Sequence, residues 1–292
     1  MRLLLALAAL LGVAESRAAV VDVFPGPGTP LQDAIDAAAP GDTLYVHNGT
    51  YGESITITKS LRVHARDGAV TIQAGCAAAA AVTVAADDVL IRGDQRLGTL
   101  LIIEGGAVSV VDVQNRGRIT IKDTVYLNGA CAGVQYGLNV SNSTDVRVMD
   151  VRTFAVPETF ADAGFRVGTI PVGGRVTVSK SFAGAATRGI LVEDCPFGSR
   201  VMLRRNVIGN EVVTDGIVLS DSDGVRILRN EFSFNTVLGV GISLDATSDD
   251  NRVTGNQFVP TGGPNASDNG TSNCWLRNNC ADATCPGPDG CP

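Results

Sequence analysis

The fold of this 292-residue chain is decided by a segment that occurs five times: Gly137-Leu-Asn-Val140, Gly164-Phe-Arg-Val167, Gly189-Ile-Leu-Val192, Gly216-Ile-Val-Leu219 and Gly241-Ile-Ser-Leu244. The interval between successive glycines of this segment is nearly constant. A second short apolar segment follows each of them, as in Val146-Arg-Val148 and Val201-Met-Leu203. A fixed period of this kind is typical of one structural unit that is repeated and stacked, so equivalent residues form columns along the molecule.

The repeated unit has the pattern of short β-strands. From Asp42 onward apolar and polar residues alternate in short segments, with no crossover helices between them. A unit of about 25 residues is too small for a four-stranded propeller blade, but it fits one coil of a β-helix with two or three strands. The first and third residues after each glycine are expected to point inward. Asn206, Asn230 and Asn256, with Ser181 one coil earlier, are expected to form a hydrogen-bonded ladder.

One helix is expected, over residues 29–38. Thr29 would occupy its N-cap and Pro30 its first helical position, and Leu31, Ala34, Ile35 and Ala38 would share one face. Such a helix would cover the apolar end of the first coil of a solenoid.

The N-terminal region resembles that of a known family. Leu31-Gln-Asp-Ala-Ile-Asp-Ala-Ala38, then Gly49-Thr-Tyr-Gly-Glu53 and Ile55-Thr-Ile-Thr-Lys-Ser60, is similar to the start of pectin-lyase-like proteins with carbohydrate-associated β-helix repeats. The resemblance covers roughly residues 20–260. It implies an all-β fold: a single-stranded, right-handed parallel β-helix with an N-terminal capping helix and a disulfide-stapled C-terminal tail.

The chain is expected to be exported. Residues 1–19 combine Arg2, a 12-residue apolar run and small residues before a cleavage point after Ala18 or Ala19, which is the pattern of a signal peptide. The β-helix domain would then span residues 20–262, and a Cys-rich tail residues 263–292. No later segment is apolar for long enough to span a membrane. We therefore expect a secreted or extracellular protein, periplasmic in a Gram-negative host, which acts as a monomer.

The seven cysteines fit an oxidising compartment. Cys274, Cys280, Cys285 and Cys291 lie close together in the tail and allow three pairings, and a disulfide staple is favoured over a metal site. Because seven is odd, at least one thiol is free or pairs between molecules. The acidic Glu193 and Asp194 are expected to raise the thiol pKa of Cys195, which argues against a nucleophile. His47 and His64 are isolated, and a structural or surface role is expected for both.

Candidate site residues are acids and bases that recur at matching positions of neighbouring coils. Glu193, Asp221 and Asp245 follow the glycine segments, so carboxylates one coil apart would lie about 5 Å from each other, near the spacing of a retaining glycosidase pair. Asp194, Asp221 and Asp223 could instead hold Ca²⁺. Solvated turn residues are the structural alternative for this acidic column.

A basic column accompanies the acidic one. Lys180, Arg205 and Arg229 recur after the second strand and suit the binding of a uronate or sulfated glycan, or the proton abstraction of a lyase. Arg147, Arg204, Arg226 and Arg252 are expected to point outward from the same sheet. A charged outer face that keeps the sheet soluble is the structural alternative.

Two functions follow from these patterns. The first is a secreted β-helix protein that binds or cleaves an acidic polysaccharide, as a lyase or glycoside hydrolase, with Ca²⁺ as the one expected cofactor. The second is a non-catalytic surface, adhesion or accessory scaffold. The chain lacks the Asn-Thr-Asp, Asp-Asp and Gly-His-Gly set of pectin hydrolases and the Arg-x-Pro-x-x-Arg of pectate lyases. A net charge of −7 without a basic block argues against a nucleic-acid partner.

Overall fold

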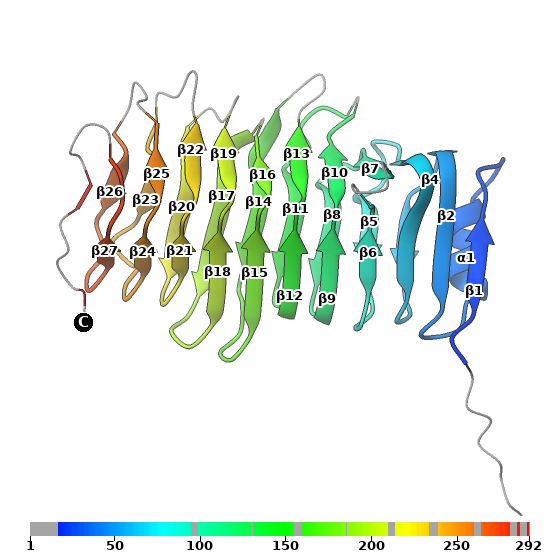
Figure 1. Ribbon diagram of the computed structural model, residues 1–292, viewed down its shortest axis with the longest axis horizontal. Coiled ribbons are helices and arrows are strands. Elements are labelled where there is room, and N and C mark those ends of the chain that lie inside the picture. The colour runs from blue at the N-terminus through cyan, green and yellow to red at the C-terminus, as the bar shows by residue number, and fades with distance from the viewer. Residues whose placement is uncertain are drawn as a thin grey trace, which may run out of the picture.

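The computed structural model describes residues 17–94, 99–129, 131–154, 159–184, 186–209, 214–233, 239–259, 264–280, 285–286 and 291. These residues form a parallel β-solenoid with 27 strands and one helix in the described part. The strands stack along the long axis of the molecule from the N-terminal to the C-terminal end (Figure 1). The predicted N-terminal leader falls almost wholly on residues 1–16, which lie outside the described residues.

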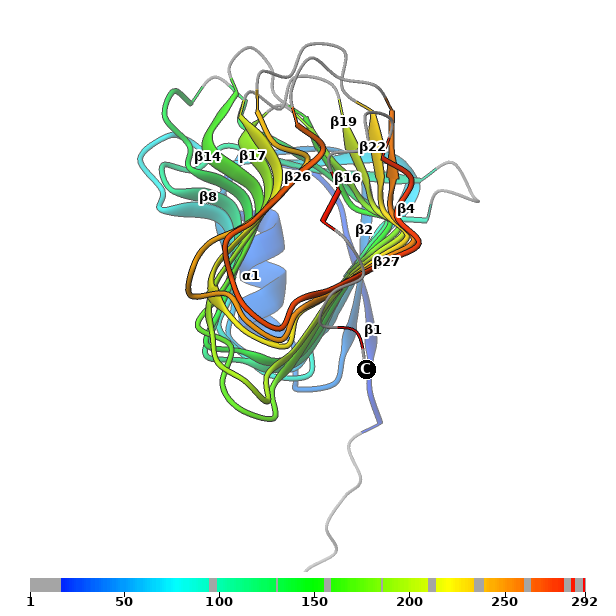
Figure 2. The ribbon, with the colours of Figure 1, turned by 90° about the vertical axis from the view of Figure 1, so that its left-hand side faces the viewer.

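Each full coil contributes three strands, and these form two sheets. The first, sheet B, has nine strands. They are β3 (Ile55–Ile57), β5 (Ala80–Val84), β8 (Ser109–Gln114), β11 (Tyr136–Ser141), β14 (Phe160–Gly168), β17 (Ala186–Cys195), β20 (Asp215–Ser222), β23 (Ile242–Leu244) and β26 (Ala266–Asp268). Sheet B faces the other sheet across the interior of the solenoid (Figure 2).

The second sheet, sheet A, has 18 strands in two rows that meet at a bend. We call the first the A1 row: β6 (Leu90–Arg92), β9 (Gly117–Lys122), β12 (Thr144–Met149), β15 (Arg175–Ser179), β18 (Arg200–Arg204), β21 (Arg226–Leu228), β24 (Arg252–Thr254) and β27 (Cys274–Leu276). The A2 row follows it: β7 (Leu100–Glu104), β10 (Thr124–Leu127), β13 (Arg152–Phe154), β16 (Phe182–Ala183), β19 (Val207–Gly209), β22 (Glu231–Ser233) and β25 (Gln257–Phe258). At the N-terminal end β1 (Val20–Val23) pairs with β2 (Thr43–Tyr51), and β2 with β4 (Arg62–Gln73).

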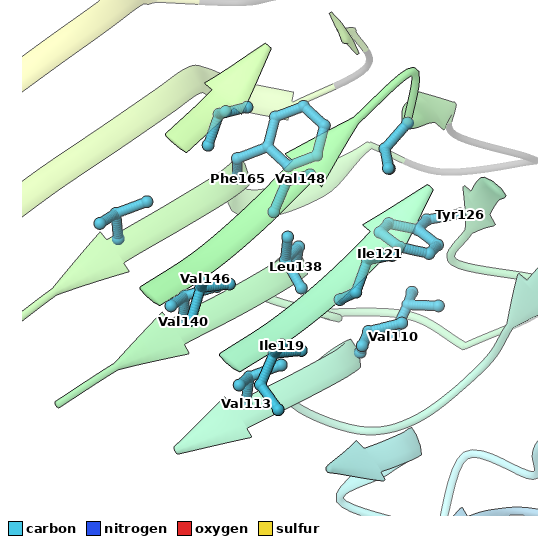
Figure 3. Packing of buried hydrophobic residues seen from close by; sticks show 14 of the residues in the cluster. Val110, Val113, Ile119, Ile121, Tyr126, Leu138, Val140, Val146, Val148 and Phe165 are labelled. Atoms are coloured by element: carbon cyan, nitrogen blue, oxygen red, sulfur yellow. The ribbon is translucent and has the colours of Figure 1, made fainter. Parts of the chain in front are cut away.

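The core consists of the columns that the glycine repeat predicts. The first residues after the glycines (Leu138, Phe165, Ile190, Ile217 and Ile242) and the third (Val140, Val167, Val192, Leu219 and Leu244) are all at most 1% exposed. Figure 3 shows Leu138, Val140 and Phe165 of this set packed against Val146 and Val148 of the A1 row. Each such aliphatic side chain contributes about 1.5–3 kcal/mol by its burial, so the columns are the main source of stability.

The glycines recur because a side chain would not fit. A Cβ at Gly216 would lie 2.5 Å from the carbonyl oxygen of Gly241 and 2.8 Å from the Phe232 ring. A Cβ at Gly189 would lie 2.6 Å from the Gly216 carbonyl oxygen and 2.7 Å from Ile208. The repeated glycine therefore brings sheet B close to the large side chains of the A2 row.

The asparagine ladder is confirmed at the bend between the A1 and A2 rows. The Asn206 side chain donates to Oδ1 of Asn230 at 3.0 Å, and Asn230 donates in the same way to Asn256. Asn256 in turn donates to Oδ1 of Asn278, which extends the ladder by one coil. At the other end of the ladder the backbone N–H of Ser181 donates to Oδ1 of Asn206. Each asparagine thus satisfies polar groups that the bend leaves without strand partners.

The expected capping helix is α1 (Pro30–Ala37), with Leu31 and Ile35 fully buried against the first coil. Thr29 occupies the N-cap position, but its side chain does not cap the helix. Instead the carboxylate of Glu53 accepts the N–H groups of Leu31 and Gln32 at 2.9 and 2.8 Å. At the other end Lys59 donates to the carbonyl oxygens of Asp36 and Ala38. Both ends of the helix are therefore satisfied by side chains of the first coil.

Disulfides close both a mid-chain loop and the tail. Cys76 pairs with Cys131, Cys274 with Cys291, and Cys280 with Cys285. This confirms a disulfide staple in the tail, and it leaves Cys195 as the buried free thiol. Within the part of the chain that the structure describes, no helix is long and apolar enough to cross a membrane.

Candidate functional site

A groove rich in arginine crosses the outer face of the A1 row. It spans β12, β15, β18 and β21 and has a volume of about 720 Å³. Five arginines line it, with no carboxylate among the lining residues: Arg147, Arg175, Arg200, Arg204 and Arg226. We call this surface the arginine groove. Its outward arginines include three that the strand alternation predicts, namely Arg147, Arg204 and Arg226.

Strand alternation and register bring these side chains together. Val176, Val178, Val201 and Leu203 point into the core, so the residues between and beside them face outward. Arg175 is directly paired with Arg200, and Met202 with Arg226. Neighbouring strands in a sheet lie about 4.8 Å apart, so cationic side chains of successive coils crowd onto one surface.

Most of this positive charge has no counter-ion among the described residues. Arg147 lies 3.4 Å from a carboxylate oxygen of Asp145. The other four arginines of the groove make no ion pair with any of the described residues. Like charges at this spacing repel, and an anionic ligand would remove the repulsion. The charges of the groove are therefore chemically suited to a negatively charged group.

The predicted basic column lies at the edge of this groove. Lys180, Arg205 and Arg229 have left-handed backbone angles, with φ near 54°, at the bend between the A1 and A2 rows. Lys180 and Arg205 directly follow Ser179 and Arg204, which line the groove. These three cations thus extend the positive surface along one side, but they are not part of the groove lining.

The predicted acidic column lies at the opposite end of the A1 strands. Register pairs Glu193 with Ser220, which places Asp194 beside Asp221 in the next coil. Both aspartates are exposed and have left-handed φ angles of 53° and 45°. The five-residue strand β18 (Arg200–Arg204) separates them from Arg205. The acids and the bases therefore occupy two corners of the coil, and the arginine groove lies between them.

Three of the acids are engaged in contacts within the protein. Glu193 accepts hydrogen bonds from the guanidinium of Arg166. Asp245 accepts from the hydroxyls of Ser220, Thr247 and Ser248. Partial burial alone would raise the pKa of Asp245, but these hydrogen bonds outweigh it and hold the pKa below its usual value. The third, Asp223, accepts the N–H of Asp249. A catalytic role for Glu193, Asp221 and Asp245 stays a prediction, as does one for Lys180, Arg205 and Arg229.

The carboxylates expected to bind Ca²⁺ do not converge. Among the described residues there is no group of three or more His, Cys, Asp or Glu side chains placed to hold a metal ion. Asp194, Asp221 and Asp223 therefore do not form a preformed cage, and Ca²⁺ binding there stays a prediction.

A polar cluster on the outer face of sheet B was not anticipated from the sequence. Arg166 connects Glu193 to Asn139, whose side-chain amide donates to Asp112. The guanidinium also lies 5.5 Å from the centre of the Tyr136 ring. Asn139 and Arg166 each come two residues after a repeat glycine, so their shared column could have been found from the period. In this cluster the charges are paired within the protein, in contrast to the arginine groove.

The surroundings of Cys195 and of the two histidines agree with the sequence predictions, which assign no nucleophilic role to Cys195 and a structural or surface role to His47 and His64. Burial is the main cause that raises the thiol pKa of Cys195 to about 11, with smaller contributions from Asp194 and Glu193. The ring nitrogens of His47 lie 2.9 and 2.8 Å from carboxylate oxygens of Asp22 and Asp67. Burial, with Arg92 and Arg62 nearby, lowers the pKa of His64 to about 4.

Comparison with known proteins gives the family. The family described as "Periplasmic copper-binding protein (NosD)" matches residues 102–285, and the chain belongs to this family. No protein of curated function matches the chain.

Solved structures share the fold. A pectate lyase, Pel9A, is 16% identical with a TM-score of 0.53, over 92% of this chain and 82% of that one. The ORF18 protein of Geobacillus virus E2 is 14% identical with a TM-score of 0.49, over 89% of this chain and 61% of that one. Rice weevil pectin methylesterase is 11% identical with a TM-score of 0.45, over 90% and 88% of the two chains. At these identities the likeness to the lyase shows the parallel β-helix alone.

Proposed function

We propose that this protein binds an acidic polysaccharide along the arginine groove. The observation that carries the proposal is the set of four arginines, Arg175, Arg200, Arg204 and Arg226, that lie on one groove without an ion-pair partner among the described residues. Guanidinium groups form paired hydrogen bonds to carboxylates and sulfates, and they are the preferred side chains for such recognition.

The shape of the groove supports a polymer. It crosses four stacked strands, so its cations repeat along the solenoid axis at roughly the strand spacing of 4.8 Å. A chain of acidic sugars could contact several coils at once, which adds affinity by holding many weak contacts together. Lys180, Arg205 and Arg229 would extend the contact along the neighbouring edge.

The proposed location is outside the cytoplasm. Three disulfides form in oxidising compartments, and the family is described as periplasmic. A secreted or periplasmic protein would meet extracellular or cell-envelope glycans there.

The copper of the family description does not fit the residues of this chain. The whole sequence has two histidines. His47 contacts Asp22 and Asp67, whereas His64 lies near Arg62 and Arg92. Six of the seven cysteines are paired and Cys195 is buried, so thiolate ligands are also lacking. Copper prefers imidazole, thiolate or thioether ligands. The described residues hold no group of three or more His, Cys, Asp or Glu side chains that could bind a metal ion. The thioethers of Met149 and Met202 line the arginine groove, but no histidine or cysteine lines it with them. We therefore derive no role for copper.

The test compares acidic with neutral polymers. Polygalacturonate, alginate, chondroitin sulfate and neutral dextran would be titrated into the purified protein at low salt and again at 0.5 M salt. We expect binding of at least one acidic polymer and not of dextran, with a loss of affinity at high salt because counter-ions compete. Absence of binding to every acidic polymer at low salt would overturn the proposal.

Variants locate the binding surface. The triple variant Arg175→Gln/Arg200→Gln/Arg226→Gln is expected to bind at least about tenfold more weakly, which corresponds to about 1.4 kcal/mol. Arg152→Gln is the matched control, since Arg152 is an exposed arginine of β13 in the A2 row and does not line the groove. Equal affinities for the triple variant and the wild type would exclude the groove as the site.

The same polymers test cleavage. Unsaturated uronates and new reducing ends would be followed with and without added Ca²⁺. Product that is lost in the Asp221→Ala variant would support the catalytic prediction for the acidic column. Binding without product on any polymer would favour the non-catalytic alternative.

A further inference from the structure

We infer that the arginine groove has an apolar rim, formed by Phe197 and Val172, against which a sugar ring of the bound polymer stacks. This inference rests on the proposed function and makes it more specific. With such a rim, the groove selects anionic pyranose chains over polyanions that have no apolar face.

The rim arises from an insertion in two consecutive coils. Arg147, Thr177, Met202 and Arg226 occupy the same outward position in four successive strands of the A1 row. The number of residues between the repeat glycine and this position is the same for Arg147 and Arg226, but it is larger for Thr177 and Met202 in the two coils between them. The connection from β14 to β15 and that from β17 to β18 are each lengthened by three residues. These two connections extend further than their neighbours at the lower edge of Figure 1.

The two long connections are stacked on each other. The N–H of Gly173 donates to the carbonyl oxygen of Gly198 at 2.9 Å, and that of Arg200 to Gly174 at 2.8 Å. A Cβ at Gly198 would lie 3.2 Å from Cγ1 of Val172. The position of Phe197 is thus set by backbone hydrogen bonds between coils, and it does not depend on an isolated loop.

The apolar side chains of these connections face solvent beside the groove. Phe197 is 68% exposed and Val172 is 72% exposed. The Phe197 ring lies 3.9 Å from the position of a Cβ on Gly224, and Gly224 lines the groove together with Ser199 and Arg200. A single exposed apolar residue needs no explanation, but here two lie on adjacent coils at the edge of a charged groove.

This combination matches the chemistry of an acidic sugar. A pyranose ring presents a face of C–H groups, and in a uronate or sulfated sugar the anionic group projects from its edge. An aromatic side chain can cover the C–H face while arginines hold the anion, as in ligand sites that pair apolar walls with a few charged groups. Inorganic polyphosphate carries comparable charge but has no apolar face. It would use the arginines and leave the rim unused.

The experiment compares two classes of ligand, acidic oligosaccharides and inorganic polyphosphate, on variants of the rim and of the groove. Oligogalacturonate and chondroitin sulfate hexasaccharides on one side, and inorganic polyphosphate on the other, would be titrated into the wild type, Phe197→Ala and Arg200→Gln at low salt. We expect Phe197→Ala to weaken the binding of at least one of the oligosaccharides about tenfold and that of polyphosphate by less than about twofold, a difference of more than about fivefold between ligands. Arg200→Gln should weaken both. Phe197→Trp should restore oligosaccharide binding.

A second exposed phenylalanine provides the control. Phe24→Ala removes another exposed phenylalanine, 62% exposed and stacked on His47 at the N-terminal end, and should leave both affinities unchanged. If the wild type binds the oligosaccharides and Phe197→Ala binds them equally well, the rim is excluded while the proposed function stands. If the wild type binds polyphosphate alone, or no ligand, the proposed function itself fails. A concentration-dependent dimer that Phe197→Ala abolishes would show that the rim contacts a second copy, which would also overturn the inference.

Discussion

Arg175 and Arg200 occupy directly paired positions on β15 and β18, on the outer face of the A1 row. Both line the arginine groove, and neither forms an ion pair with any residue in the described part of the chain. Opposite charges on paired strand positions stabilise a sheet, and like charges on such positions destabilise it. We therefore expect the pairing to lower the stability of the free protein, and a bound anion to relieve the repulsion.

Neutralising one of these arginines should stabilise the free protein. For Arg200→Gln we expect the free energy of unfolding to rise by about 0.5 kcal/mol at low ionic strength, because two unit charges 4 Å apart in water repel by about 1 kcal/mol. The gain should vanish in 0.5 M salt, where the Debye length is about 4 Å. Urea unfolding at both salt concentrations measures it. Arg152→Gln should show no gain, and a loss of stability in Arg200→Gln would mean that Arg200 has a stabilising partner.

Adding a methyl group at a repeat glycine should destabilise the fold. In Gly216→Ala the new Cβ would meet the Gly241 carbonyl oxygen and the Phe232 ring, both within 3 Å. Overpacking of this kind costs about 1–3 kcal/mol. Thermal and urea unfolding would measure the loss. Gly52→Ala is the control, because a Cβ at Gly52 would have no atom of the described residues within 4 Å, and a neutral Gly216→Ala would contradict the close approach of the two sheets.

Removing one rung of the asparagine ladder should also destabilise the protein. Asn230 is 1% exposed, donates to the Leu203 carbonyl oxygen and accepts the N–H of Asn206. Asn230→Ala leaves these buried groups without partners, each at a cost of about 1–3 kcal/mol. Asn278→Ala, at the less buried end of the ladder, should cost less. Equal losses at the two positions would argue that the ladder is not graded by burial.

Apart from the capping helix and the disulfides of the tail, the features that could be predicted from the sequence are those that repeat. The glycines, the inward columns and the asparagines recur at nearly constant intervals, so each coil confirms the interpretation of the next. Arg175 and Arg200 escaped this reasoning because each stands at the start of its strand, before the first inward residue (Val176 or Val201), where a connection of variable length ends. A count from the nearest glycine therefore fails at the turn that follows sheet B, where the rim residues Val172 and Phe197 also lie.

Contacts between segments that occur once could not be predicted either. The sequence indicates a helix with Thr29 at its N-cap, but the capping carboxylate comes from Glu53, 22 residues after Leu31. Nothing in the local pattern distinguishes Glu53 from any other acidic turn residue. The separation of the acidic and basic columns has the same origin, since only the folded coil shows that the strand Arg200–Arg204 lies between them.

Loss of the Glu53 carboxylate should weaken the N-terminal cap. Glu53→Gln keeps one acceptor oxygen but removes the negative charge near the N-terminus of α1 and one of the hydrogen bonds to Leu31 and Gln32. We expect a loss of about 1–2 kcal/mol in the free energy of unfolding, comparable to the loss of an N-cap side chain. Glu231→Gln, at an exposed position of β22, is the control. A substitution at Glu53 without effect would show that the helix does not depend on this contact.

His64 should make the stability of the protein depend on pH in a defined window. In the folded protein, burial and then the charges of Arg92 and Arg62 lower the pKa of His64 to about 4, and its Nε2 is buried without a hydrogen-bond partner among the described residues. In the unfolded chain the imidazole titrates near a pKa of about 6.5. Between these two values the unfolded state binds a proton that the folded state does not, so stability falls as the pH decreases from about 6.5 towards 4. At pH 7 and above the contribution of His64 is fully present.

The variant His64→Gln lacks this titration. As the pH is lowered through this window, the free energy of unfolding of the wild type should therefore fall relative to that of the variant. Urea midpoints of both proteins at pH 7.5, 6.0 and 4.5 would measure the difference. His47 and all carboxylates are present in both proteins, so their titration cancels in the comparison. A difference that stays constant over the three pH values would mean that His64 takes up its proton in the folded state as readily as in the unfolded chain.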